Sequence, residues 1–93
     1  MITKVVLSRQ AQKDLDRVPR HIQIKLLSWV EAVEHEGLEN VRKIPGYHDE
    51  PLKGARAGQR SIRLSKEYRA IYEIGSSGAM SIAEVQEVTK HGY

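Results

Sequence analysis

A proline between two helical patterns constrains this chain more than any other feature of its sequence. Before it, Ala11, Leu15 and Val18 recur at i, i+4 and i+7, which places three apolar side chains on one face of a helix. Pro19 cannot continue that helix, because it lacks a backbone N–H, but it suits the start of another. A longer apolar stripe then follows at helical spacing, made by Ile22, Leu26, Leu27, Trp29, Val30 and Val33. The two helices form a hairpin that needs an apolar surface to lie on.

Four segments rich in β-forming residues predict the strands that supply this surface: residues 3–7, 60–64, 68–74 and 81–88, the last three separated by turns. Ser8 is a predicted helix N-cap and Gly37 a predicted helix end. Residues 38–58 lack periodicity, so we expect a long loop with at most a short helical turn. The order is β-α-α-β-β-β. We expect one α+β domain over residues 1–93, a two-helix hairpin packed on one face of a mostly antiparallel four-stranded sheet.

The composition excludes several kinds of function. The chain has no cysteine, so disulfides, thiolate metal sites and thiol catalysis are all impossible. His48, Asp49 and Glu50 are consecutive and cannot all converge on one ion from a single strand or helix, so we expect no metal. Neither a Gly-rich phosphate loop nor a nucleophile-elbow serine is present, and we expect no cofactor. No apolar stretch is long enough for a membrane span or a signal peptide, so we expect a cytoplasmic protein.

Charge is distributed unevenly along the chain, whose formal net charge is +3. Between residues 53 and 69 the acid Glu67 stands alone against six cations, Lys53, Arg56, Arg60, Arg63, Lys66 and Arg69. Because strand side chains alternate between faces, Arg63 points away from Ile62 and Leu64, onto the face that the helices do not cover. In one of two possible phases Arg69 joins it from the next strand. Such a patch favours nucleic-acid binding, because guanidinium groups bind phosphate through paired hydrogen bonds, but surface strands also carry Arg for solubility.

The chain ends on Lys90, His91 and Tyr93. Histidine exchanges protons near neutral pH, and tyrosine can stack on an unpaired base, so this segment can carry acid–base chemistry beside a phosphate. It can equally be a frayed tail, as chain ends often are.

Three phrases of the sequence resemble the RelE/ParE superfamily of toxins from type II toxin–antitoxin modules. They are Glu50-Pro51-Leu52-Lys53-Gly54, then residues 60–64 (RSIRL), then residues 68–72 (YRAIY). The ending, residues 88–93, is similar to that of the HigB-type branch, which with RelE-like members forms the mRNA interferase group. HigB-like members often have a histidine where this chain has Glu50.

The resemblance implies a ribosome-dependent mRNA endonuclease that works without metal or cofactor, through attack of the RNA 2′-hydroxyl on the adjacent phosphodiester. Arg63 and Arg69 would hold the scissile phosphate, and Lys53 and Lys90 would add charge. Arg56 and Arg60 would extend RNA binding. His91 would be the general acid or base, and Tyr93 would orient or stack the base. The implied partners are a cognate antitoxin protein and the ribosome with its mRNA.

Two other functions remain open at this stage. A ParE-like inhibitor of DNA gyrase would share the fold and act by protein binding, with no need for convergent Lys, Arg, His and Tyr. A non-enzymatic RNA- or ribosome-binding module would use the same basic face, and its binding would weaken with salt without cleavage.

Overall fold

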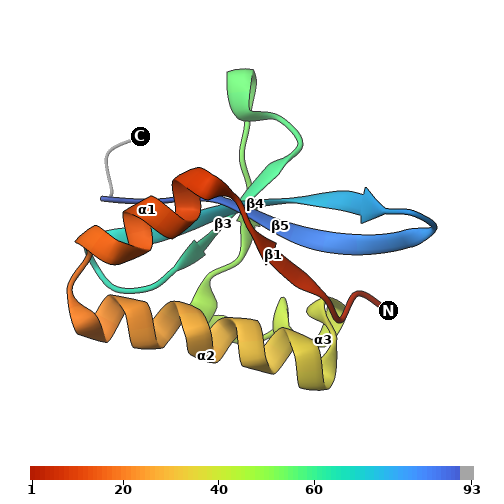
Figure 1. Ribbon diagram of the computed structural model, residues 1–93, viewed down its shortest axis with the longest axis horizontal. Coiled ribbons are helices and arrows are strands. Elements are labelled where there is room, and N and C mark those ends of the chain that lie inside the picture. The colour runs from red at the N-terminus through yellow and green to blue at the C-terminus, as the bar shows by residue number, and fades with distance from the viewer. Residues whose placement is uncertain (91–93) are drawn as a thin grey trace.

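The computed structural model describes residues 1–90, which form a five-stranded sheet with helices packed against it (Figure 1). The strands are β1 (Val5–Leu7), β2 (Glu50–Pro51), β3 (Gln59–Arg63), β4 (Tyr68–Ser77) and β5 (Met80–Lys90). Their order across the sheet is β1-β5-β4-β3-β2, with β1 parallel to β5 and the other pairs antiparallel. The predicted α+β class and mostly antiparallel sheet are confirmed.

The predicted number of four strands is wrong, because β2 adds a fifth. It lies within residues 38–58, where we expected a loop, and it has only two residues, one of them a proline. Such a strand has no periodicity of its own. It exists because Glu50 and Pro51 pair with Ser61 and Arg60 of β3. The same region also holds α3 (Leu38–Val41), η1 (Pro45–Tyr47) and η2 (Gly54–Arg56).

The two long helices agree closely with the sequence. They are α1 (Arg9–Arg17) and α2 (Arg20–Glu36), with Pro19 directly before the second. Ser8 caps α1, since its hydroxyl accepts a hydrogen bond from the Ala11 N–H at 3.0 Å. Gly37 ends α2 at a φ of 84°, a conformation that glycine adopts at little cost. Within residues 1–90, no helix is long and apolar enough to cross a membrane.

The core lies between α2 and one face of the sheet, which we call the covered face. Trp29 of α2 meets Tyr72 of β4 there, with ring centroids 5.2 Å apart. Burying side chains of this kind contributes about 1.5–3 kcal/mol each. The main buried contributors are Ile22, Leu26, Val33, Ile62, Ala70, Ala83, Val85 and Val88. The other side of the sheet, which we call the open face, is the side from which the η2 loop rises (Figure 1).

Helix α1 continues the edge of the sheet where β1 ends. The Ser8 N–H donates to the Val85 carbonyl at 2.9 Å, and the Ser8 hydroxyl donates to the Gln86 carbonyl at 2.7 Å. Farther along, the Val88 N–H donates to the Asp14 carboxylate at 3.0 Å. These bonds satisfy backbone groups of β5 that would otherwise stay unpaired at an edge. They also hold α1 directly beside the open face.

Candidate functional site

The strand pairing arranges the open face as three rows of side chains, because residues opposite each other in antiparallel strands share a face. The first row is Arg63, Arg69 and Thr89. The second is Glu50, Ser61, Ile71 and Glu87. The third is Gln59, Glu73 and Glu84. The face therefore changes from basic to acidic along the strands.

The first row brings together the two arginines that the sequence singled out. Arg63 and Arg69 are direct cross-strand partners, so both guanidinium groups emerge from the same side of the β3–β4 hairpin. Arg63 is exposed, whereas Arg69 is only 7% exposed. Like charges directly opposite each other in a sheet are destabilising, by roughly 0.2–1 kcal/mol. An anion bound between them would remove that repulsion.

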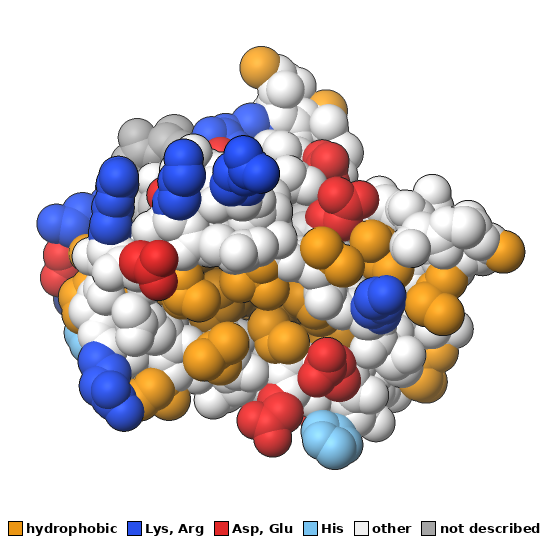
Figure 2. Space-filling view, in the orientation of Figure 1, with side chains coloured by type: hydrophobic (Ala, Val, Ile, Leu, Met, Phe, Trp, Pro, Cys, Tyr) orange, Lys and Arg blue, Asp and Glu red, His pale blue; other side chains and the backbone are white. Residues whose placement is uncertain are grey.

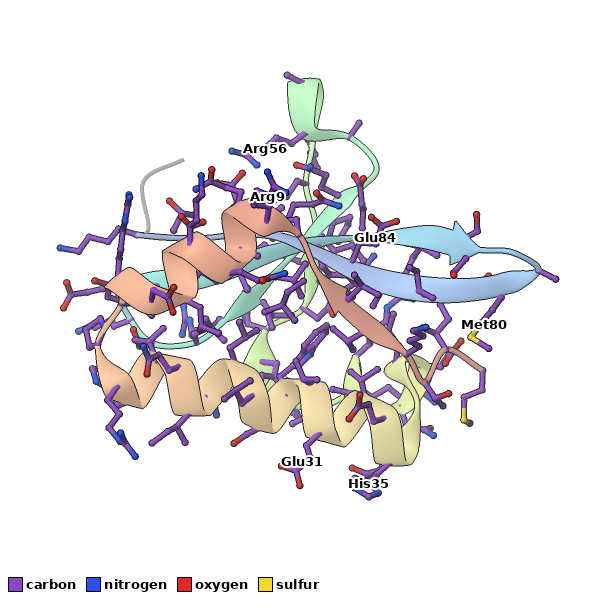
Figure 3. The ribbon with its side chains drawn as sticks, in the orientation of Figure 1. Arg9, Glu31, His35, Arg56, Met80 and Glu84 are labelled. Carbon is purple, nitrogen blue, oxygen red and sulfur yellow. The ribbon has the colours of Figure 1, made fainter. Side chains whose placement is uncertain are left out.

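The loop after β2 supplies further cations. Lys53 is exposed and directly precedes η2. Arg56 projects from the raised loop (Figure 3), and its Nη1 lies 3.1 Å from Gln59 Oε1 and 3.5 Å from Glu87 Oε2. The bond to Glu87 spans the second row and ties the loop to β5. Arg56 thus reaches residues of the open face and holds the loop in place, and Lys53 is an exposed cation of the same loop.

The structure places Arg60 on the covered face, away from the arginine pair. Its Nε donates to Asp49 Oδ1 at 2.6 Å, and the Tyr72 hydroxyl donates to Asp49 Oδ2 at 2.5 Å. The Asp49 side chain is fully buried. Partial burial disfavours the charge on Arg60, but the hydrogen bond and charge of Asp49 outweigh it, so the pKa of Arg60 is raised. Burial, and then the bond to Asp49, also raise the pKa of Tyr72.

The structure likewise separates Lys90 from the arginine pair. Lys90 faces Tyr68 across the hairpin, and its Nζ lies 5.9 Å from the centre of that ring. A β-bulge causes this placement: Ile71 pairs with Glu87 but Tyr72 pairs with Val85, so Gln86 is an extra residue in β5. The bulge reverses the alternation, so Val88 and Lys90 share the side of Tyr68 and Thr89 takes the open face. His91 and Tyr93 lie outside the described residues.

Glu50 lies on the open face, although the sequence reasoning did not select it as a candidate. It opposes Ser61, which places its carboxylate in the second row, diagonal to Arg63 at roughly 7–8 Å between backbone positions. Its Oε2 lies 3.5 Å from His48 Nε2, and both side chains are about half exposed. The sequence offered two signals: Glu50 stands where HigB-like members often have a histidine, and it directly precedes Pro51, in a strand too short to recognise.

The consecutive residues His48, Asp49 and Glu50 do not converge. Asp49 turns to the covered face, whereas Glu50 points to the open face beside His48. His48 has a φ of 48°, an uncommon value for a residue with a side chain. In the part of the chain that the structure describes, no three His, Asp or Glu side chains gather as metal ligands.

The acidic end of the open face is formed by a cross-strand pair, Glu73 and Glu84. Gln86 Nε2 donates to Glu73 Oε1 at 3.3 Å. Glu84 lies over Gly75, which has no side chain to displace it. The two carboxylates would repel a phosphate, so an anionic ligand of the arginine pair would be kept at the other end of the face.

Comparisons with known proteins place this geometry in a family. The model of the ParE toxin of the type II toxin–antitoxin system parDE matches residues 5–89. A YoeB/ParE toxin from Agrobacterium tumefaciens is 25% identical, with a TM-score of 0.67 over 96% of this chain and 99% of that one. No curated protein sequence matches the chain significantly.

Two further solved structures share the fold at lower identity. YafQ from E. coli strain BL21(DE3) is 17% identical, with a TM-score of 0.73 over 95% of this chain and 92% of that one. The archaeal RelE from Pyrococcus horikoshii OT3, solved as a RelE–RelB complex, is 20% identical, with a TM-score of 0.70 over 99% and 98% of the two chains.

Proposed function

Because the chain belongs to the ParE toxin family of type II toxin–antitoxin systems, we propose that it is a toxin that cuts mRNA on the ribosome, with the open face as its active surface. The resemblance to the RelE/ParE superfamily is confirmed, and the closer likeness to its HigB-type branch stays a prediction. Endonuclease activity is the function that the residues of the open face support best.

The observation that carries this proposal is the cross-strand pair Arg63 and Arg69. Placing two guanidinium groups opposite each other lowers stability. Two fixed positive charges do suit the transition state of phosphodiester cleavage, in which negative charge grows on the phosphate oxygens. Such preorganised charge is usually the largest single contribution to catalysis.

The proposed reaction uses the RNA 2′-hydroxyl as nucleophile. Its proton passes to a base, the 2′-oxygen forms a bond to phosphorus, and the bond from phosphorus to the 5′-oxygen of the next nucleotide breaks. The leaving oxygen takes a proton from an acid. The products are a 2′,3′-cyclic phosphate and a free 5′-hydroxyl, so no metal or cofactor enters the balance.

We assign the base to Glu50, on the evidence of its position. It is a half-exposed carboxylate on the same face as the arginines and diagonal to Arg63. His48 lies 3.5 Å away and is placed to orient it. Proton transfer by a positioned side chain contributes about 10²–10⁴-fold to a rate. With Glu50 as the base, we assign His91, predicted as acid or base, to the acid, and Tyr93 stays the residue proposed to orient or stack the RNA base.

The other predicted site residues divide by face. Lys53 and Arg56 keep their proposed role in RNA binding on the open face. We assign Arg60 to the Asp49 network instead, because its guanidinium is bonded on the covered face. Lys90 lies at the end of β5 beside Tyr68. We therefore propose that it adds positive charge at that end of the sheet and does not contact the scissile phosphate.

A protein partner follows from the family. RelE of Pyrococcus horikoshii was solved with RelB, and YoeB of Staphylococcus aureus with YefM. We therefore propose a cognate antitoxin for this chain.

The test is to express the chain from a tightly controlled promoter and to map mRNA 5′ ends during translation, beside the variants Arg63→Ala and Glu50→Gln. We expect new ends within translated codons, and a loss of about 10²–10³-fold in cutting for Arg63→Ala. Arg42→Ala is the matched control, because Arg42 is an exposed arginine that follows α3 and is close enough to act on the charge of Tyr72, on the covered face. Equal cutting by wild type and Arg63→Ala would contradict the assigned site.

A gyrase inhibitor is the second candidate, and the match to the ParE model favours it. It predicts growth arrest with intact mRNA and with DNA damage, unchanged by Glu50→Gln. The third reading, a non-enzymatic RNA- or ribosome-binding module, predicts neither cleavage nor DNA damage. The same expression experiment therefore separates all three.

A further inference from the structure

Helix α1 carries a row of cations that the arginine pair does not explain. Arg9, Lys13 and Arg17 recur at i, i+4 and i+8 and are all exposed. Figure 2 shows Lys and Arg side chains in a row over α1. At a rise of about 1.5 Å per residue, neighbouring cations stand roughly 6 Å apart along the helix, so the row spans about 12 Å. We call these three residues the α1 row.

The α1 row has no acidic partner among residues 1–90, where no ion pair or hydrogen bond of its side chains occurs. Of the two acids in the helix, Asp16 is exposed three residues after Lys13 but forms no ion pair with the row, and Asp14 is turned away from it. Asp14 accepts hydrogen bonds from the Gln10 side chain at 2.7 Å and from the Val88 N–H at 3.0 Å, and so faces β5. The first turn of α1 contains no acidic residue, although the helix dipole disfavours a cation such as Arg9 there. No ion pair within residues 1–90 therefore neutralises these charges.

The position of α1 joins this row to the open face. The helix runs beside β5 from Val85 to Val88, next to the edge at which the first row of the face ends with Thr89. Arg9 lies on the same side of the sheet as Arg56 and Glu84 (Figure 3). A polyanion that crosses the arginine pair meets Glu73 and Glu84 along the strands, and the α1 row beyond the edge of β5. Of these two paths only the second is attractive.

We propose that the α1 row is a second RNA-binding site, which holds backbone phosphates outside the cleavage site and leads the RNA away over α1. This inference rests on the proposed function for its direction, because it takes RNA to be the ligand of the arginine pair. The row recognises phosphates and no base edges, so its contribution is independent of sequence and falls with salt.

The test measures binding apart from cleavage. The probes are fluorescein-labelled 2′-O-methyl RNAs of about 20 nucleotides, one single-stranded and one duplex, which lack the nucleophile and cannot be cut. Affinity is followed by anisotropy between about 50 and 200 mM NaCl. The variant is Arg9→Gln, Lys13→Gln and Arg17→Gln together. The charge-matched control is Lys25→Gln, Arg42→Gln and Lys43→Gln, three exposed cations of α2 and the segment after α3.

For the single strand we expect the slope of log affinity against log salt to become shallower by about 2 in the α1 variant, from three lost contacts at about 0.7 each. The control should keep the wild-type slope. A larger loss on the duplex than on the single strand would identify structured RNA as the natural ligand. Equal slopes for the wild type and the α1 variant, or equal losses in both triple variants, would overturn the inference.

Failure of the proposed function is distinguishable from failure of this inference. A wild type that binds both probes through the α1 row but produces no new mRNA ends would contradict the nuclease and leave the RNA-binding site standing. A wild type that binds neither probe but still produces new mRNA ends during translation would overturn the α1 site and leave the nuclease standing.

Discussion

Arg60 and Arg63 lie three residues apart in one strand and meet opposite surroundings. Arg60 points to the covered face, where Asp49 binds it at 2.6 Å and Tyr72 binds the other oxygen of the same carboxylate. Arg63 points to the open face, where its cross-strand partner is another arginine and no ion pair holds it within residues 1–90. Asp49 neutralises the charge of Arg60, whereas the charge of Arg63 is available to an external anion.

The difference teaches how a small domain divides its arginines between two tasks. On the covered face a charge is partly removed from water, so it must have a partner or the fold loses stability. On the open face water solvates Arg63, and its repulsion with the largely buried Arg69 is tolerated. Local rules are usually broken where function requires it, and the open face is the side that breaks them.

The strongest test of this contrast between the two faces is to remove the carboxylate of Asp49. Asp49→Ala leaves the partly buried Arg60 without its carboxylate and the Tyr72 hydroxyl without its acceptor. We expect a loss of about 3–5 kcal/mol in the free energy of unfolding, measured by urea denaturation. Asp49→Asn should lose less, because an amide oxygen still accepts from Tyr72.

Asp16→Ala is the control, since Asp16 is exposed on α1 and its removal should change stability by about 0.5 kcal/mol or less. If Asp49→Ala and Asp16→Ala were equally stable, Arg60 would be solvated like Arg63, and the contrast between the faces would not hold.

A smaller effect should appear in alkaline solution, through Tyr72. Its pKa is raised, first by burial and then by the bond to Asp49, so the folded protein keeps the proton that the unfolded chain releases near pH 10. The stability from this group is therefore complete below about pH 10 and falls as the pH rises toward the folded value. The slope for one proton is at most about 1.4 kcal/mol per pH unit.

The measurement compares the free energy of unfolding of wild type and Tyr72→Phe between about pH 9 and pH 11. The variant should be less stable at neutral pH, because Asp49 loses a hydrogen bond, but its alkaline slope should be shallower. Parallel slopes for the two proteins would mean that Tyr72 does not hold its proton more tightly in the folded state.

Much of the fold could be predicted because the signals are local. Helical spacing, the cap at Ser8 and the end at Gly37 each depend on neighbouring residues, and alternation in β3 placed Arg63 correctly against Ile62. The two-residue β2 could not be predicted, because it exists only through pairing with β3.

The site was predicted in part for the same reason. The partner of Arg60 lies eleven residues earlier in the chain, and no local pattern links the two. Alternation alone, continued from Val85, would bring Lys90 to the open face. The bulge at Gln86 reverses it, and a bulge is a property of the paired strands. Glu50 gained its place on the open face from β2, which was itself unpredicted.

The smallest expected change in the free energy of unfolding is the most informative, because it is an increase whereas the changes predicted above are losses. Arg63→Gln removes one charge of the cross-strand pair, so the free energy of unfolding should rise by roughly 0.2–1 kcal/mol while mRNA cutting is lost. Arg63→Lys is the matched control: it keeps the repulsion and should have wild-type stability. The gain should shrink in about 1 M salt, because the Debye length there is about 3 Å and charges farther apart than that are largely screened. A variant that is both inactive and less stable would mean that Arg63 belongs to the fold, as Arg60 does. A variant that is inactive and more stable would mean that Arg63 lowers stability while it supports cutting, the trade-off expected where activity needs a locally destabilised site.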